Sequence, residues 1–176
     1  MEAMTVPHEE MPQRKWLRTE YLPSLNGTAL YIGVRWYCED YWKLVPDPDL
    51  FCTVDIDPAQ AHFGSPKNHY VCDATSLLVR SRYDHVSAFG LFGMPDSHLK
   101  TPSKIVEFLR LCASAVNDGG TLMFSCGTRT LNMEQVNEIC QQLLTPDWIA
   151  LKDWTLKPSP EHSEERILWI RRCQNS

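Results

Sequence analysis

Residues 30–37, Leu-Tyr-Ile-Gly-Val-Arg-Trp-Tyr, and residues 51–58, Phe-Cys-Thr-Val-Asp-Ile-Asp-Pro, form the pattern that decides the fold. The first stretch is an apolar run that stops at Gly33, and the second is an apolar run that stops at Asp55. Residues 39–45, which lie between them, have the length and the aromatic face of a short helix. Strand, glycine turn, helix, strand and acid together predict a βαβ unit of the kind that binds a ribose-bearing cofactor.

The glycine and the acid have separate physical roles in such a unit. Gly33 lacks a side chain and lets a ligand approach the backbone at the end of the first strand. Asp55 ends the second strand and can accept hydrogen bonds from ribose hydroxyls, while the helix start offers unpaired N–H groups. Asp57 competes for the ribose role, but an Asp before a Pro is typical of a helix cap. We therefore favour Asp55 as the ribose ligand.

The same two stretches resemble the first two motifs of the class I S-adenosylmethionine-dependent methyltransferases. The fuller pattern, Tyr-Ile-Gly-Val-Arg followed by Val-Asp-Ile-Asp-Pro, resembles a small branch with a reduced glycine loop, because Gly33 stands alone where the superfamily usually has two or three glycines. The resemblance implies S-adenosylmethionine as the cofactor, with Gly33 under its methionine part and Asp55 on its ribose. Ile56 would lie against the adenine; its alternative is core packing.

The resemblance extends to the ends of the next two strands. Asp73 would lie near the exocyclic amine of the adenine and the backbone N–H of Ala74 near a ring nitrogen, whereas the alternative for Asp73 is a cap for the turn that begins at Thr75. Phe89 stands where the superfamily usually has a polar or acidic residue, and we expect it to pack beside the cofactor or the substrate. The chain has no Asn-Pro-Pro-Tyr-like sequence here, which argues against N-methylation of a base or an amide.

Three further side chains are candidates for contact with ligands. Arg35 could form a charge-assisted pair with the methionine carboxylate, or it could cap the loop through backbone carbonyls. Tyr37 could contact the same end of the cofactor or the substrate. His98 is the candidate general base, although a histidine in a loop is most often simply solvated. His62, His69 and His85 show no ligand spacing, so we predict no metal site.

Hydrophobic periodicity predicts five strand–helix alternations followed by a terminal hairpin. We expect an α/β protein with the Rossmann-like methyltransferase fold: a mostly parallel sheet, a C-terminal antiparallel hairpin and helices on both faces. Residues 1–27 would form an N-terminal arm and helix, a possible lid, and residues 28–176 the methyltransferase-like domain. The expected strands are 28–32, 51–55, 69–72, 83–89, 121–126, 147–156 and 166–171, and the expected helices are 14–25, 39–45, 101–116 and 132–144.

Composition narrows the class of protein. A chain of 176 residues is most simply one domain, and its net charge of −5 argues against a surface that coats nucleic acid. Seven cysteines, an odd number without a Cys-x-x-Cys pair, indicate a reducing compartment. The N-terminus has no apolar signal region, and no apolar run reaches membrane-spanning length. We expect a cytoplasmic protein without membrane or nucleic-acid partners, and a homodimer is one option for its assembly.

The leading hypothesis is methyl transfer from S-adenosylmethionine to a small-molecule nucleophile. The alternative is a repurposed methyltransferase-fold protein that acts as a binding partner or as a non-methylating enzyme, which the single-glycine loop and Phe89 would suit. A third reading, a nicotinamide-dependent oxidoreductase, is disfavoured because Gly-x-Gly-x-x-Gly is absent and the chain is expected to end in a hairpin.

Overall fold

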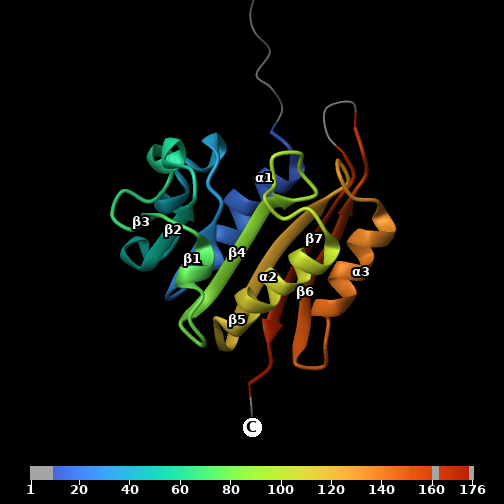
Figure 1. The fold of residues 1–176 in the computed structure, drawn as a ribbon. Coiled ribbons are helices and arrows are strands. Elements are labelled where there is room, and N and C mark those ends of the chain that lie inside the picture. Colours follow the sequence, from blue (N-terminus) through green and yellow to red (C-terminus); the bar gives the residue numbers. More distant parts are fainter. Residues whose placement is uncertain (1–9, 160–162, 175–176) are drawn as a thin grey trace, which may run out of the picture.

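The computed structural model describes residues 10–159 and 163–174, which build a seven-stranded sheet of order β3-β2-β1-β4-β5-β7-β6 (Figure 1). The strands from β3 to β5 are parallel, and β7 runs antiparallel to both β5 and β6. This confirms the predicted mostly parallel sheet with a C-terminal antiparallel hairpin. The strands are β1 (Ala29–Ile32), β2 (Phe51–Asp55), β3 (His69–Val71), β4 (Tyr83–Phe92), β5 (Val116–Gly127), β6 (Trp148–Leu156) and β7 (Glu165–Arg172).

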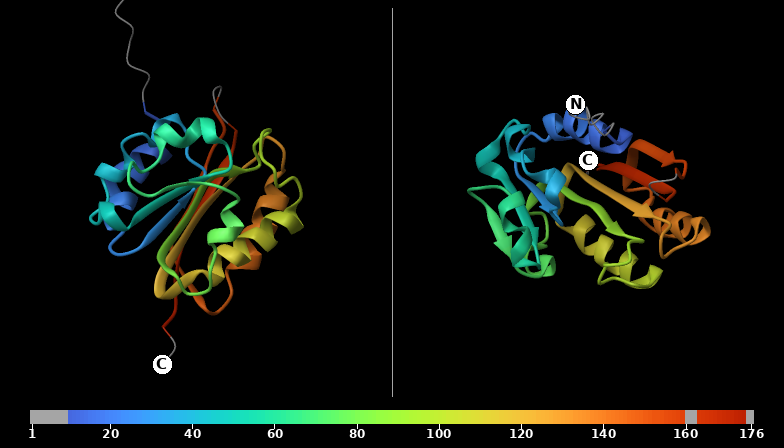
Figure 2. Two further views of the ribbon diagram at one scale, coloured as in Figure 1. Left: turned by 60° about the vertical axis from the view of Figure 1, so that its left-hand side comes forward. Right: turned by 90° about the horizontal axis from the view of Figure 1, so that it is seen from above.

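Helices cover both faces of the sheet, as predicted (Figure 2). One face carries α1 (Pro12–Trp16), which continues through a π-helical turn at Leu17–Tyr21 and a 3-10 turn at Leu22–Ser24. The other face carries α2 (Pro102–Ser114) and α3 (Met133–Leu143). Two separate cores result, one between α1 and the sheet and one between α2, α3 and the sheet.

The two long helices begin where the sequence places their caps. The side chain of Thr101 accepts a hydrogen bond from the backbone N–H of Lys104, and Pro102 occupies the first turn of α2. Asn132 and Gln135 form a reciprocal capping box at the start of α3. Such caps satisfy N–H groups that have no partner inside the helix, so these boundaries were predictable from sequence.

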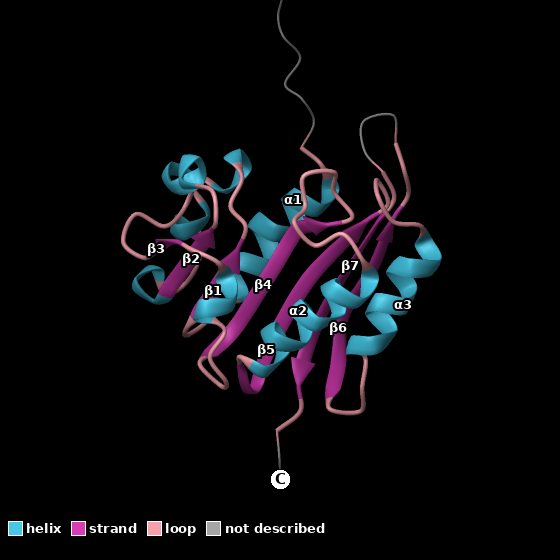
Figure 3. Ribbon diagram, viewed as in Figure 1, coloured by secondary structure: helices cyan, strands magenta, loops and turns pink. Residues whose placement is uncertain are grey.

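The predicted helix over residues 39–45 is wrong. The connection from β1 to β2 contains only 3-10 turns, at Trp36–Cys38, Tyr41–Lys43 and Pro48–Leu50. Proline at positions 46 and 48 removes backbone donors just where a helix would continue. The crossovers from β2 to β3 and from β3 to β4 are also 3-10 turns, at Pro58–Phe63 and Ala74–Leu77, so this end of the sheet has short turns instead of long helices (Figure 3).

The two central strands are longer than predicted. Strand β4 continues past Phe89 to Phe92, and β5 begins at Val116 although residues 117–120 read as a loop. The pairing of β4 with β5 is irregular at both of these places, between Tyr83 and His85 and between Ala88 and Phe92. The Asp84 carboxylate accepts a hydrogen bond from the Asn117 side chain across the first irregularity. The turn-forming residues at these places thus belong to irregular parts of the strands. Local sequence signals do not distinguish such bulges from loops.

The segment that precedes β1 is part of the core. Leu17, Tyr21 and Leu22 are fully buried, and the rings of Trp16 and Tyr21 pack against Trp169 of β7 at centroid distances of 6.0 and 5.6 Å. Of the N-terminal arm and helix expected over residues 1–27, residues 1–9 lie outside the described residues. Within the described part of the chain, no helix combines the length and the apolar character needed to cross a bilayer.

Candidate functional site

Two adjoining pockets lie at the carboxyl ends of the parallel strands, the edge of such sheets where ligands bind. We call the first the edge cleft; it has a volume of about 400 Å³ and is lined by the ends of β1, β2 and β3 and by the loop after β4, including Gly33, Asp55, Ile56, Asp57, Asp73 and Ala74. We call the second the aromatic pocket; it has a volume of about 490 Å³ and is lined by residues that include Tyr37, Phe89, Phe92, Arg129 and Glu165. Arg35, Phe92 and Asp96 line both.

Asp55 holds the rim of the edge cleft together. One carboxylate oxygen accepts the backbone N–H of Val34 at 3.1 Å, and the other accepts that of Asp57 at 2.8 Å. The side chain therefore ties the loop after β1 to the loop after β2. Each carboxylate oxygen can accept more than one hydrogen bond, so this structural role leaves capacity for a ribose hydroxyl.

Asp57 and Asp73 both act as caps. The Asp57 carboxylate accepts the backbone N–H of Ala59 at 2.9 Å, and the Asp73 carboxylate accepts the backbone N–H and the hydroxyl of Thr75 at 3.0 and 2.9 Å. These two hydrogen bonds to Thr75 lower the pKa of Asp73. The capping interpretation of both residues is confirmed, and both also line the edge cleft.

Ile56 and Ala74 give the edge cleft apolar surface beside these acids. The side chain of Ile56 is 54% exposed, so its alternative role in core packing is wrong. An isoleucine held at the rim of a cleft, next to carboxylates and backbone N–H groups, suits a ligand that is part apolar ring and part polyol.

Gly33 adopts a backbone conformation with φ of +79°, which favours glycine. A Cβ atom at this position would lie within 2.2 Å of the Cδ2 atom of Leu91. The space left by the absent side chain is therefore filled by Leu91, which itself lines the edge cleft. This corrects the expectation that Gly33 leaves its backbone open. Leu91 was missed because the sequence ends strand β4 at Phe89.

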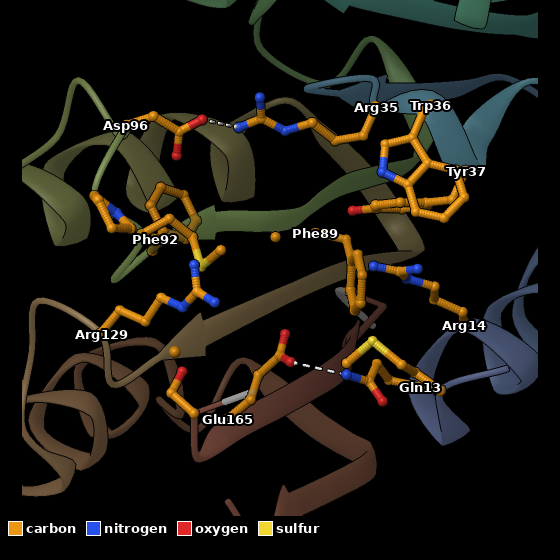
Figure 4. Close-up of a pocket in the computed structure, with 16 residues that line it drawn as sticks. Gln13, Arg14, Arg35, Trp36, Tyr37, Phe89, Phe92, Asp96, Arg129 and Glu165 are labelled. Carbon is orange, nitrogen blue, oxygen red and sulfur yellow. Dashed lines mark hydrogen bonds and ion pairs between the residues drawn. The ribbon is translucent and has the colours of Figure 1, made fainter. Parts of the chain in front are cut away.

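Tyr37 and Phe89 line the aromatic pocket and not the edge cleft (Figure 4). Their rings are perpendicular with centroids 6.4 Å apart, and Phe89 is buried. Burial raises the pKa of the Tyr37 phenol far above its ordinary value, so this hydroxyl is neutral near pH 7. Both were predicted as cofactor ligands, but they line the aromatic pocket, whereas the other predicted cofactor ligands line the edge cleft.

Arg35 joins the two pockets. Its guanidinium forms an ion pair with the Asp96 carboxylate at 3.1 Å, and the two side chains lie across the junction (Figure 4). The predicted alternative was that the Arg35 side chain caps backbone carbonyls. Among the described residues, this side chain donates no hydrogen bond to a backbone carbonyl. His98, the candidate base, is exposed and lines the edge cleft and not the aromatic pocket. The described residues contain no group of three or more side chains suited to hold a metal ion.

Sequence analysis missed most residues of the aromatic pocket, among them Gln13, Arg14, Phe92, Arg129 and Glu165. They come from α1, β4, the turn after β5 and the start of β7. No local motif joins them. The only usable signal was the rule that the ends of parallel strands meet at one edge, which would have drawn attention to Arg129.

No protein-family model matches this chain, and no curated protein sequence does so either. Several solved structures, in contrast, are similar to it in fold. The N-methyltransferase NodS from Bradyrhizobium japonicum WM9 superimposes with a TM-score of 0.66 at 12% identity, over 92% of this chain and 93% of that one. This chain has the class I methyltransferase fold.

Other methyltransferases share this fold at similarly low identity. A SAM-dependent methyltransferase from Archaeoglobus fulgidus has a TM-score of 0.59 at 15% identity, over 91% of this chain and 93% of that one. Magnesium protoporphyrin IX methyltransferase from Synechocystis PCC 6803, solved with bound SAM, has a TM-score of 0.61 at 15% identity, over 91% of this chain and 76% of that one. At such identity the class I methyltransferase fold is established, and the chemistry has to be argued from the site.

Proposed function

We propose that the edge cleft binds S-adenosylmethionine and that the protein transfers its methyl group to a small-molecule nucleophile held in the aromatic pocket. The observation that carries this proposal is the position of the edge cleft, at the carboxyl ends of β1, β2 and β3, with Asp55, Ile56 and Asp73 around it. The methyltransferases named above, two of which are described as SAM-dependent or SAM-bound, support the same reading.

The residues at the cleft match the parts of this cofactor. The Asp55 carboxylate is available to the ribose hydroxyls, the exposed side chain of Ile56 to the adenine ring, and the Ala74 backbone together with Asp73 to the adenine edge. Arg35, at the junction of the pockets, is available to the methionine carboxylate if its pair with Asp96 rearranges. The volume of about 400 Å³ lies within the range of ordinary ligand sites.

The chain's contribution to such a reaction is positioning. The cofactor supplies an electrophilic methyl group, and the acceptor needs alignment and a partly dehydrated environment more than a dedicated base. Tyr37, Phe89 and Phe92 provide an apolar wall next to the junction with the edge cleft. His98 remains a candidate base, although its location away from the aromatic pocket weakens that assignment. The seven cysteines are unpaired thiols, which fits a reducing compartment such as the cytoplasm.

A second candidate is a repurposed fold that no longer transfers methyl groups. Two observations favour it: Leu91 fills the space above Gly33, and Arg35 already has a carboxylate partner. In this case the edge cleft would not accept S-adenosylmethionine unless both side chains moved. The nicotinamide reading stays the weakest, because β7 runs antiparallel between β5 and β6.

Calorimetric titration with S-adenosylhomocysteine separates these candidates. We expect the wild-type protein to bind, and the Asp55→Asn variant to bind about tenfold more weakly because a charge-assisted hydrogen bond is lost. Asp57→Asn is the matched control: asparagine caps a helix start as well as aspartate does, so its affinity should change by less than about threefold. Titration with NAD should give no heat.

In Asp55→Asn, the side-chain NH2 group replaces one of the two oxygens that accept backbone N–H groups, so one of these hydrogen bonds is lost. The melting temperature of this variant must therefore be measured together with its affinity. Ile56→Ser provides an independent check, because its side chain is exposed and folding does not depend on it. We expect this variant to lose about tenfold in affinity. Wild-type protein that gives no heat supports the repurposed fold, and unchanged affinity in both variants contradicts the assignment of the cleft.

A further inference from the structure

The aromatic pocket carries more guanidinium groups than carboxylates. Arg14, Arg35 and Arg129 line it, against Asp96 and Glu165. The Arg35–Asp96 ion pair uses one of each. Within the part of the chain that the structure describes, neither Arg14 nor Arg129 forms an ion pair with a carboxylate. The pocket therefore has an excess of one positive charge, in a protein whose net charge is −5.

The Arg14 guanidinium is held in place at one wall. Its carbon atom lies 4.3 Å from the centroid of the Tyr37 ring and 4.9 Å from that of Trp36, a cation–π arrangement. Arg14 belongs to α1, which is anchored in the core by Trp16. The cation is thus fixed at the pocket wall by aromatic rings that do not neutralise its charge.

Arg129 approaches from the opposite side. It lies in the turn after β5, and Figure 4 shows its guanidinium directed toward the middle of the pocket while Arg14 stands beside Phe89 across from it. The turn is tied to the start of β7 by two hydrogen bonds from Thr128, through its backbone N–H and its hydroxyl, to the carbonyl of Glu164. The two guanidinium groups therefore stand at different walls of one pocket, and an anionic group bound in it is attracted by both.

The rings between these cations favour a flat ligand. Tyr37 and Phe89 meet at 89° and Phe92 closes the far side, so a planar molecule can contact one ring face and another ring edge. Glu165, at the base of the pocket, accepts a hydrogen bond from the Gln13 side chain at 3.3 Å. With the carboxylates of Asp96 and Glu165 both counted, the preference for an anion rests on the third guanidinium.

We propose that the aromatic pocket binds a small aromatic acid, with its ring against Tyr37 and Phe89 and its carboxylate toward Arg14 and Arg129. That this molecule is the methyl acceptor rests on the proposed function; that it binds does not. Anion recognition by guanidinium groups is strong because their N–H donors match the two oxygens of a carboxylate.

The test uses three fluorinated probes of one shape and different charge, followed by fluorine NMR with the full-length protein. We expect 4-fluorobenzoate to bind at least tenfold more tightly than neutral 4-fluorobenzamide, and 4-fluorobenzylamine to bind least. Equal affinity for benzoate and benzamide would overturn the proposal, and so would a preference for the amine, which would mean that Asp96 and Glu165 dominate.

Arg129→Gln should weaken 4-fluorobenzoate binding about fivefold to tenfold while 4-fluorobenzamide is unaffected. Arg129 is exposed, so the substitution leaves folding intact. Arg80→Gln is the matched control, since Arg80 is also exposed but lines neither pocket. Arg14→Gln, checked for folding by circular dichroism, should show the same selective loss. Benzoate affinity unchanged in both pocket variants would contradict the proposed site.

Repeating each titration with and without S-adenosylhomocysteine keeps the two proposals apart. Benzoate that binds in protein giving no heat with S-adenosylhomocysteine supports the aromatic-acid site and contradicts the proposed cofactor. Protein that binds S-adenosylhomocysteine but shows no preference for benzoate retains the proposed function and loses this inference.

Discussion

Gly33 and Leu91 together shape the edge cleft at the level of single residues. Gly33 has φ of +79°, and the Leu91 side chain occupies the place where a Cβ atom would project. A left-handed conformation costs other residues about 1–2 kcal/mol. The glycine is therefore required twice, by its own backbone and by the packing of a neighbouring strand, before any ligand is considered.

We predict that Gly33→Ala lowers the free energy of unfolding by about 1–3 kcal/mol, because a strained backbone adds to a displaced Leu91. In a Leu91→Ala background the same substitution should cost less, since only the backbone strain remains. Urea denaturation of the four proteins in this cycle gives the coupling. Equal costs in both backgrounds would show that Leu91 does not fill the space above Gly33.

At the level of elements, the protein divides into a part with short turns and a part with long helices. The crossovers that follow β1, β2 and β3 are 3-10 turns, whereas those that follow β4 and β5 contain α2 and α3. Both helices are capped by side chains at their start. The edge cleft lies over the part with short turns. There the carboxylates of Asp57 and Asp73 cap the 3-10 turns by accepting backbone N–H groups.

We predict that Asn132→Ala lowers the free energy of unfolding by about 1 kcal/mol, because the backbone N–H of Gln135 loses its capping oxygen. Gln141→Ala in the last turns of α3 is the control; this residue is exposed, and its replacement should change stability by less than about 0.5 kcal/mol. Chemical denaturation measures both. Similar small effects in the two variants would mean that the capping box contributes nothing.

At the level of the whole molecule, residues 12–25 and the sheet form one packed unit. Trp16, Leu17 and Tyr21 share a core with Tyr31 of β1 and Ile167 of β7. The same segment places Gln13 and Arg14 at the aromatic pocket. Deleting residues 1–25 would therefore remove core side chains together with the two pocket residues.

We predict that this segment unfolds together with the sheet. Tryptophan fluorescence, to which Trp16 and Trp169 contribute among six tryptophans, and far-ultraviolet circular dichroism should give coincident thermal transitions. Leu17→Ala should lower the free energy of unfolding by about 2–5 kcal/mol and shift both transitions equally, because a fully buried side chain leaves a cavity. Glu20→Ala, on the exposed side of the same segment, is the control. A fluorescence transition that precedes the loss of circular dichroism would contradict a single unit.

The amino-acid sequence by itself determined the order of strands and helices, the class of fold, the caps of α2 and α3, and the acids at the ends of β2 and β3. These features follow from hydrophobic periodicity and capping signals, which act over a few neighbouring residues. The same signals failed for residues 39–45, where Pro46 and Pro48 remove backbone donors, and for residues 117–120, where an irregularity in the pairing of β4 with β5 accommodates turn-forming residues.

The tertiary structure alone decided how the site is assembled. Leu91 lies against Gly33, Asp55 ties two loops together, and Tyr37 and Phe89 belong to the aromatic pocket with Arg14, Arg129 and Glu165. These contacts join residues that are far apart in the chain. No spacing encodes such contacts, because they depend on where the folding of the whole sheet brings its strand ends.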